Sequence, residues 1–555
     1  MKIFTLILFS FICFSVNAQQ WEWGRNAQGS DNDKTNAVCT DASGNVFVTG
    51  SFESPTITFG SITLTNSIWG GGDNMFIAKY DANGNVLWAK HVGNWDNNAV
   101  GTSVSIDGNG NVFVTGHFAS STITFDSITL NNGGWADMFI AKYDPNGNVL
   151  WAKNGIGASL DAGVSVSTDI AGDALVTGFF ESSTLTFGTH VLTNSTYYSH
   201  GYNLFLVKYD ANGNVLWAKS AVGTGGGTPR SVNVDPAGNA FVTGEFNTPS
   251  MTFDSITLTG GSSFIAKYDV NGNVVWAKST VGAHSTCASA DPNGNVFVAG
   301  WFGTATIAFG SVVLNNSSTG YNVFTVKYDA NGNALWAKSA DGGLYVQGWS
   351  VSADLYGNAF VTGYFQSPPI AFDSVTLTPP PANCSYSSSP YCDPMFIVKY
   401  DANGNVLCAS SLASGNGSSV SADRFGNAYI GGWFGVNPFI VNTDTLPFTS
   451  TGLQNVFVGK FYSGNNDVAL NVPVNTPQAN TVFPNPSSGI FTVDFKNTTV
   501  ATQICVYDVL GNCLWNKNCR NEENTKIDLS SQPKGIYFLE IVSDNKKSVN
   551  KIVLQ

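Results

Sequence analysis

The stretch KYDANGNVLWAK, Lys79 to Lys90, decides the fold because the chain repeats it. Near copies begin at Lys142, Lys208, Lys267, Lys327 and Lys399. In each copy Asp-x-Asn-Gly-Asn separates two runs rich in strand-forming residues. An Asp that begins a tight turn accepts hydrogen bonds from backbone N–H groups just after it, while Asn and Gly adopt left-handed dihedral angles. The motif therefore predicts a turn between two antiparallel strands.

The same motif also resembles the start of an EF-hand calcium loop. Glycine, however, stands at its fourth position and not its sixth, and the closing Glu is missing. In a related motif, Asp-x-x-Gly-Asn, the third residue is often no ligand at all, as at Ala171, Ala237, Tyr356 and Phe425. We therefore predict that both motifs set shape, with no metal and no cofactor bound.

The related motif reveals the repeat length. It is followed by an apolar run ending in Gly-x-Phe, and its copies lie about 63 residues apart, at Asp41, Asp107, Asp169, Asp235, Asp291, Asp354 and Asp423. Each repeat reads as four strands, here called A to D, with a hairpin such as TITFGSITLTN (56–66) between B and C. A fixed period of this length indicates a solenoid or a propeller.

The two ends of the repeat region distinguish these alternatives. Strand B occurs seven times, but the D strand NVLWAK occurs only six times. The N-terminal WEWGR (21–25) aligns with VLWAK, with Trp23 on Trp88 and Arg25 on Lys90. We therefore predict an all-β fold: a seven-bladed β-propeller over 19–463, closed by the N-terminal strand.

Two repeated side chains are assigned to packing. The D-strand tryptophans, Trp23 to Trp336, are predicted to fill space between blades, since Cys408 replaces Trp in the sixth copy. The lysine near the end of the C strand occurs in all seven copies, from Lys79 to Lys460. We predict that it is a structural partner of nearby turn carboxylates.

Composition and the N-terminus limit the partners. A net charge of −13 and a pI near 4.7 argue against nucleic acid, which requires a basic face. Residues 1–18 are predicted to be a Sec signal peptide, with a membrane anchor as the alternative, and no later segment is apolar enough to span a bilayer. The exported chain keeps eight cysteines, of which Cys384 and Cys392 are the candidate disulfide.

The C-terminal region has a different pattern. Residues 464–480 are predicted to be a linker, and 481–555 read as short strands forming a small immunoglobulin-like β-sandwich. This tail resembles the type A C-terminal sorting domain of the Bacteroidetes type IX secretion system. The resemblance rests on VYDVLG (506–511), on the terminal KIVLQ, and on Pro484, Asn485, Pro486, Gly489, Gly535, Tyr537 and Lys551. It implies recognition by the type IX machinery, removal of the tail, and release or attachment to surface lipopolysaccharide.

Two weaker resemblances concern the repeats. Residues 41–462 resemble the SBBP β-propeller repeat family, which implies a propeller and no defined activity. FDSI at Asp126 and Asp254, and FDSV at Asp373, resemble a short O-glycosylation signal of the same phylum. Gly60 replaces the Asp in FGSI, so a hairpin turn is the preferred interpretation.

Enzyme classes find little support. A sialidase needs three clustered arginines, but only Arg230 lies outside an outer strand, a turn or the tail. The sequence lacks the adjacent cysteine pair that quinoprotein cofactor sites often use. The five histidines fall at unrelated repeat positions, which argues against a metallohydrolase. Glutamate is scarce, although variable loops could still assemble the acid pair of a glycosidase. We predict a non-catalytic protein, with a propeller hydrolase as a minor alternative.

The variable loops indicate binding. The A–B and C–D turns share one face and are uniform, whereas the D–A and B–C connections share the other face and vary. The candidate ligand-binding residues on this variable face are Trp95, Asp96, Arg230, His284, Tyr345 and Trp349. We predict an exported or surface-attached propeller that binds a glycan or a protein. The alternative is a structural or adhesion protein without a discrete pocket.

Overall fold

The structure is a computed structural model, and its chain divides into two compact units, Met1–Gly464 and Asn465–Gln555. It describes residues 20–66, 72–93, 98–194, 201–223, 226–316, 320–366, 369–378, 393–412, 414–435, 438–449, 454–462, 481–483, 487–494, 502–507, 513–519, 524–543 and 546–554. The predicted signal peptide, the linker, Pro484, Asn485, Pro486, Cys384 and Cys392 lie outside these ranges. The described residues contain strands but no helix, and therefore no helix that could cross a membrane.

Six of the main sheets within residues 20–462 have four antiparallel strands in the order A-B-C-D, as the repeat predicted, and a seventh has the same four strands and continues into two more. The A strands are β2 (Asp33–Thr40), β8 (Ala99–Ile106), β14 (Asp161–Thr168), β21 (Gly227–Val234), β27 (Ala283–Ala290), β34 (Val346–Ala353) and β40 (Asn416–Ala422). The B strands are β3 (Val46–Phe52), β9 (Val112–Phe118), β15 (Ala174–Phe180), β22 (Ala240–Phe246), β28 (Val296–Phe302), β35 (Ala359–Phe365) and β41 (Ala428–Phe434). We number the sheets 1 to 7 in this order.

The remaining strands complete each sheet. The C strands are β6 (Asn74–Tyr80), β12 (Asp137–Tyr143), β18 (Asn203–Tyr209), β25 (Ser263–Tyr268), β31 (Asn322–Tyr328), β38 (Met395–Tyr400) and β44 (Asn455–Tyr462). The D strands are β7 (Val86–Val92), β13 (Val149–Asn154), β19 (Val215–Ser220), β26 (Val274–Thr280), β32 (Ala334–Ser339), β39 (Val406–Leu412) and, in sheet 7, β1 (Gln20–Gln28).

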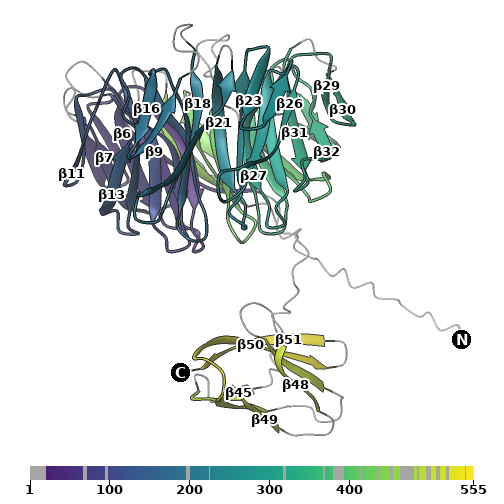
Figure 1. Ribbon diagram of the computed structural model, residues 1–555. Helices are drawn as coiled ribbons and strands as arrows, with labels where there is room; N and C mark the ends of the chain where they lie inside the picture. The colour runs from purple at the N-terminus through teal and green to yellow at the C-terminus, as the bar shows by residue number, and fades with distance from the viewer. Residues whose placement is uncertain are drawn as a thin grey trace, which may run out of the picture. The chain divides into compact units, whose positions relative to one another are not determined.

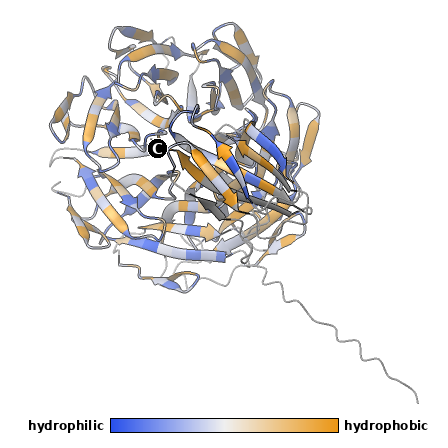
Figure 2. Cartoon of the chain, turned by 90° about the horizontal axis from the view of Figure 1, so that it is seen from below, coloured by the Kyte–Doolittle hydropathy of each residue, from blue (hydrophilic) through white to orange (hydrophobic). Residues whose placement is uncertain are grey.

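The sheets follow one another around a central axis (Figures 1 and 2). Each A strand packs against the next A strand, and β40 of sheet 7 packs against β2 of sheet 1. Serine hydroxyls join these strands: Ser103 accepts the Val166 N–H at 3.2 Å, and Ser419 accepts the Val38 N–H at 3.1 Å. Apolar clusters fill the space between adjacent sheets, as between sheets 1 and 2. This arrangement is a β-propeller.

The first strand of the unit belongs to the sheet formed by its last repeat. β1 pairs antiparallel with β44, and Gln20 lies opposite Tyr462. Trp23 lies opposite Lys460, as Trp88 lies opposite Lys79 in sheet 1. The register therefore places Trp23 and Trp88 at equivalent positions, as their alignment predicted.

A peripheral hairpin follows each B strand. The hairpins are β4–β5 (Thr56–Phe59, Ile62–Thr65), β10–β11 (Thr122–Phe125, Ile128–Asn131), β16–β17 (Thr184–Phe187, His190–Thr193), β23–β24 (Ser250–Phe253, Ile256–Thr259), β29–β30 (Thr306–Phe309, Val312–Asn315), β36–β37 (Ile370–Phe372, Val375–Leu377) and β42–β43 (Phe439–Val441, Asp444–Leu446). Several hairpins pair with the chain that follows the preceding D strand: β20 (Val222–Gly223) with β23, β33 (Asp341–Gly342) with β36, and the end of β1 with β4. The hairpins therefore connect neighbouring sheets.

The Asp-x-Asn-Gly-Asn motif forms a self-contained turn. One oxygen of Asp81 accepts the N–H groups of Asn83 and Asn85 at 2.9 and 2.8 Å, and the other accepts the Asn85 side-chain amide at 2.8 Å. Gly84 has a φ of +80°, which favours glycine. Both Asp81 oxygens are thus used by the turn itself, in agreement with the predicted role in shape.

The D-strand tryptophans contact the C–D turn of the next sheet. The Trp88 indole N–H donates to the carbonyl of Pro145 at 3.2 Å, and a side chain at Gly147 of that turn would meet the Trp88 ring at 3.1 Å. Sheet 6 carries Cys408 at the equivalent position, opposite Lys399. The next sheet, sheet 7, has no C–D turn because its D strand is β1. The tryptophan is therefore absent where its acceptor is absent.

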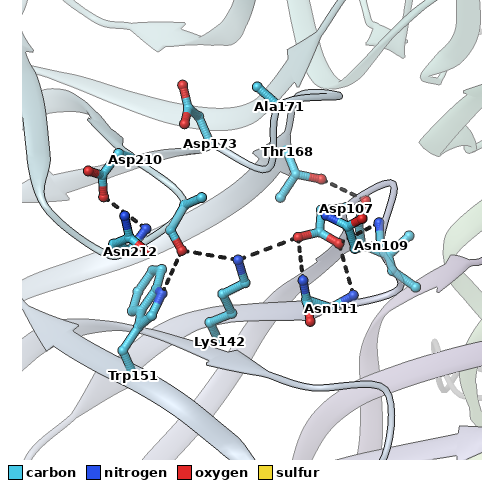
Figure 3. A network of polar contacts seen from close by, with 12 residues as sticks. Asp107, Asn109, Asn111, Lys142, Trp151, Thr168, Ala171, Asp173, Asp210 and Asn212 are labelled. Carbon is cyan, nitrogen blue, oxygen red and sulfur yellow. Dashed lines mark hydrogen bonds and ion pairs between the residues drawn. The ribbon is translucent and has the colours of Figure 1, made fainter.

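In five sheets the repeated lysine pairs with a turn carboxylate, as predicted, whereas Lys460 pairs with Glu22 of β1 at 2.7 Å and Lys79 donates to the carbonyl of Pro145 at 3.1 Å. In sheet 2 the Lys142 ammonium lies 3.4 Å from the carboxylate of Asp107 in the A–B turn, and both side chains are buried (Figure 3). Lys142 and Trp151 also donate to the same carbonyl, that of Ala211, at 3.1 Å. Equivalent ion pairs join Lys208 with Asp169, Lys267 with Asp235, Lys327 with Asp291 and Lys399 with Asp354.

The C-terminal unit contains two antiparallel sheets. One is formed by β45 (Thr481–Phe483), β46 (Ile490–Asp494) and β49 (Asn524–Asp528), and the other by β48 (Cys513–Cys519), β47 (Thr502–Tyr507), β50 (Gly535–Ser543) and β51 (Lys546–Leu554). Apolar residues of both sheets, such as Val493 and Leu539, share one core. The predicted immunoglobulin-like topology stays a prediction.

Candidate functional site

A cluster of ring-bearing and charged side chains lies at the ends of the strands of sheets 4, 5 and 6, away from the uniform turns. Its starting point is the variable residue x of the Gly-x-Phe ending of each B strand. Sheet 4 carries Glu245 there, sheet 5 Trp301 and sheet 6 Tyr364. The A-strand residues opposite them are Thr228, His284 and Gln347.

Glu245 joins two basic side chains from neighbouring sheets. Its carboxylate lies 3.4 Å from Nε of Arg230 in the same sheet and 3.4 Å from Nδ1 of His284 in sheet 5. Arg230 is about half exposed, with 47% of its side chain accessible, whereas Glu245 is mostly covered at 18%. The acid therefore fixes the two bases while both remain within reach of solvent.

Rings continue outward from His284. The imidazole stacks on Trp301 with centroids 3.7 Å apart and planes inclined by 12°. The ring centroids of Trp301 and Tyr321 are 4.4 Å apart, and those of Tyr321 and Tyr345, which meet edge to face, are 5.5 Å apart. Tyr321 and Tyr345 are exposed at 37% and 42%. These four rings form a continuous row, which we call the aromatic row.

A second pair of rings lies beside the aromatic row. Trp349 stacks on Tyr364 with centroids 6.4 Å apart and planes inclined by 25°, and Trp349 is 37% exposed. Burial, together with the charge of Asp393 and the proximity of Tyr321, raises the pKa of Tyr364. Burial also raises the pKa of Asp393, which accepts a hydrogen bond from the Gln366 amide at 2.8 Å. Polar acceptors and donors thus lie next to both groups of rings.

β-Bulges direct two of these side chains. The pairing of each A strand with its B strand skips one residue, and in sheets 4 and 6 the skipped residues are Arg230 and Trp349. At the same place in sheets 2 and 5, Thr102 and Thr286 donate to the carbonyl of the next A strand at 2.8 and 2.9 Å. Arg230 and Trp349 instead have large side chains exposed to solvent, and a bulge is a common device for re-aiming a side chain.

Four of the predicted site residues come together in this region. Arg230 and His284 share Glu245, Tyr345 ends the aromatic row, and Trp349 belongs to the second pair of rings. Trp95 and Asp96 lie outside the described residues. Sequence reasoning missed Glu245 as a site residue, and also Trp301, Tyr321 and Tyr364. The changing residue within the constant Gly-x-Phe ending was a signal that could have identified three of these four.

Two other perturbed carboxyl groups belong to the scaffold. Burial raises the pKa of Asp33 to about 7 and that of Asp161 to about 6. Both side chains are inaccessible to solvent and accept the hydroxyl of a serine, Ser54 at 2.7 Å and Ser182 at 2.6 Å. A ligand cannot reach either group, so neither is assigned to catalysis. The described residues also contain no group of three or more His, Cys, Asp or Glu side chains suited to a metal ion.

The Asp33→Asn variant is expected to change how stability depends on pH. Between about pH 4 and pH 7 the unfolded chain has an ionised Asp33, while the folded chain keeps it protonated, so the free energy of unfolding falls as pH rises. Each pKa unit corresponds to about 1.4 kcal/mol, so the variant should gain up to ~4 kcal/mol relative to the natural chain over this range. Urea unfolding at pH 4, 5.5 and 7.5 measures the difference. A constant difference across these pH values would contradict the assignment.

Comparison with known proteins adds the following. Residues 481–555 match the family model described as "Secretion system C-terminal sorting domain". An uncharacterised WD repeat-containing protein of Acanthamoeba polyphaga mimivirus is 28% identical over 439 residues, which cover 63% of this chain and 31% of the relative. The chain therefore spans about a third of that relative's length. The match at the tail supports type IX secretion, with export or surface attachment as its consequence.

The solved structures described next resemble this chain with low TM-scores. The Dos1 propeller gives a TM-score of 0.37 at 8% identity, covering 81% of this chain and 97% of its own. An apocarotenoid oxygenase from Synechocystis gives 0.35 at 10% identity, covering 80% and 97%. A DUF4221 family member from Bacteroides vulgatus gives 0.31 at 12% identity, covering 65% and 92%. At such scores these proteins say nothing about activity.

Proposed function

We propose that the chain is a non-catalytic binding protein of the SBBP type, built on a seven-bladed propeller that β1 closes. Residues 1–18 direct it through the Sec system, and the tail 481–555, an immunoglobulin-like sandwich, directs it through the type IX machinery before being removed. The product is then released or attached to surface lipopolysaccharide. The ligand is bound on the variable face, and it is a glycan.

The single observation that supports binding is the aromatic row beside the Arg230–Glu245–His284 cluster. An exposed ring offers an apolar face to the C–H face of a sugar, and charged or amide groups nearby can bond its hydroxyls. Here the exposed rings of Tyr321, Tyr345 and Trp349 adjoin such groups. Rigid strands and bulges hold these groups, which lowers the entropic cost of ordering them on binding.

The Trp349→Ala variant is expected to lose glycan binding. Truncating an aromatic residue at the centre of an interface typically costs ~2 kcal/mol or more, which corresponds to about a 30-fold weaker Kd. The measurement is a glycan array followed by calorimetric titration of the best glycan. Trp135→Ala is the matched control: Trp135 is 80% exposed, precedes the C strand of sheet 2 and should leave Kd unchanged.

The outcomes separate the alternatives. If Trp349→Ala and Trp135→Ala bind equally well, the ligand is bound elsewhere and the proposed site is wrong. If no glycan binds but a purified surface protein does, in a Trp349-dependent way, the site takes a protein. Absence of any ligand favours the alternative of a structural or adhesion protein.

A further inference from the structure

The turns of the peripheral hairpins in sheets 1 to 6 alternate between two residues at one backbone position, and Asn442 occupies it in sheet 7 with a φ of 55°. Asp126, Asp254 and Asp373 occupy it in sheets 2, 4 and 6, with φ values of 50°, 46° and 50°. Gly60, Gly188 and Gly310 occupy it in sheets 1, 3 and 5, with φ values of 57°, 58° and 61°. Glycine suits this left-handed conformation better than Asp does. The Asp side chain must therefore contribute something that offsets the strain.

The Asp side chains hold a lysine of the preceding sheet. Asp126 lies 3.5 Å from the Lys90 ammonium and also accepts the Val149 N–H at 3.2 Å. Asp254 lies 3.4 Å from Lys219, and Asp373 lies 3.1 Å from Lys338. The contact between a D-strand lysine and this carboxylate thus recurs in three hairpins, and in sheet 2 the N–H that begins the next D strand joins it.

Sheet 5 lacks the carboxylate but keeps the rest of this site. Lys278 and Ala334 are the counterparts of Lys90 and Val149, and both line a cavity of about 330 Å³ beside Gly310. Ser311 and Tyr328 line the same cavity. Within the described part of the chain, no carboxylate lies within ion-pair distance of Lys278, which is exposed.

At the junction between sheets 7 and 1, the basic side chain at the equivalent position has a carboxylate partner. Gly60 stands in the hairpin there, and Arg25 takes the place of the lysine beside a cavity of about 510 Å³. Asp444, the first residue of β43, lies 2.9 Å from Arg25 and supplies the carboxylate. Lys278 receives no such substitute.

We propose that the cavity at Lys278 binds the carboxylate of an external ligand, either a uronic acid residue or an acidic protein side chain. The carboxylate takes the position that Asp126, Asp254 and Asp373 fill in the other turns. The Lys278 ammonium and the Ala334 N–H hold it, and Ser311 and Tyr328 line the same cavity. The net charge of −13 opposes anions at long range, but salt screens this repulsion beyond about 8 Å. This site is separate from the aromatic row.

Lysine acylation followed by mass spectrometry tests the proposal residue by residue on the full chain. Sodium glucuronate and N-acetylglutamate serve as carboxylate probes at about 100 mM, since one exposed ion pair binds weakly. Glucose and sodium chloride at matched ionic strength are the controls. Either carboxylate should lower Lys278 labelling at least twofold, while the controls leave it unchanged. Protection by glucuronate alone identifies an acidic sugar, protection by N-acetylglutamate alone identifies a protein carboxylate, and equal protection by both supports a site that takes either.

Two reciprocal variants make the test specific. Gly310→Asp should lower Lys278 labelling to the level of the paired Lys219 and remove the effect of the probes. A Cβ at Gly310 meets no atom within 4 Å, so the variant should fold, which its thermal melt checks. Asp254→Gly should make Lys219 more reactive and newly protected by carboxylates. Lys278 labelling that no carboxylate changes, or that chloride lowers equally, would overturn the proposal.

Discussion

A chain that begins at residue 29 is expected to lose the cooperative folding of its N-terminal unit. β1 contributes the D strand of sheet 7, and its end also pairs with β4 of sheet 1. Trp21, Trp23 and Ala27 are almost fully buried within this strand. Truncating a single buried Trp typically costs about 3–5 kcal/mol, and a whole domain is stable by only about 5–15 kcal/mol. Differential scanning calorimetry should show the loss of the main transition.

A peptide added in trans provides the control. A synthetic peptide of residues 19–28 should pair with β44 and restore the transition in a concentration-dependent way, because strand addition satisfies the exposed backbone. A peptide of the same composition in scrambled order should not restore it. A truncated chain that melts at the temperature of the full chain would show that β1 does not hold the unit together.

The Lys327→Met variant is expected to lose about 3–5 kcal/mol of stability. Lys327 lies 3.0 Å from the Asp291 carboxylate, and the two side chains are only 4% and 0% exposed. Its ammonium also lies 4.5 Å from the centre of the Phe297 ring. Removing one member of a buried ion pair leaves the other charge buried without compensation. Urea unfolding at pH 7 measures the loss.

Matched variants separate this effect from a general loss of charge. Lys338→Met removes an exposed pair with Asp373 and should cost less than about 1 kcal/mol. The double variant Lys327→Met/Asp291→Asn should recover much of the stability, because no uncompensated charge remains. If Lys327→Met costs no more than Lys338→Met, the buried lysine does not have the structural role assigned to it.

The scaffold could be predicted from the sequence because every repeat carries the same pattern of strand and turn residues. Comparing Trp23 with Trp88 was sufficient to place β1 beside β44. The sequence also indicated that Cys408 could replace a tryptophan, but not why. The reason is that the partner of each such tryptophan is a C–D turn of the next sheet, and in sheet 7 the D strand is β1, which is not the segment that follows β44. A relation between neighbouring sheets is visible only when their order around the axis is known.

The candidate site was only partly predictable. Arg230 and His284 stood out because their loops vary among repeats. Trp301 and Tyr364 lie in strands that read as scaffold, and Tyr321 precedes a C strand. Their common feature is that strands distant in sequence end side by side, so that Glu245 of one sheet meets His284 of the next. Sequence spacing alone does not reveal such a meeting.

The pairing of β1 with β44 has a consequence for biogenesis. Gln20 pairs with Tyr462, which lies at the other end of the repeat region. Sheet 7 therefore cannot form until nearly the entire repeat region has been synthesised. Contacts between residues so distant in sequence also slow folding, because a very long loop must close first. The nascent chain therefore stays without its completed ring throughout synthesis.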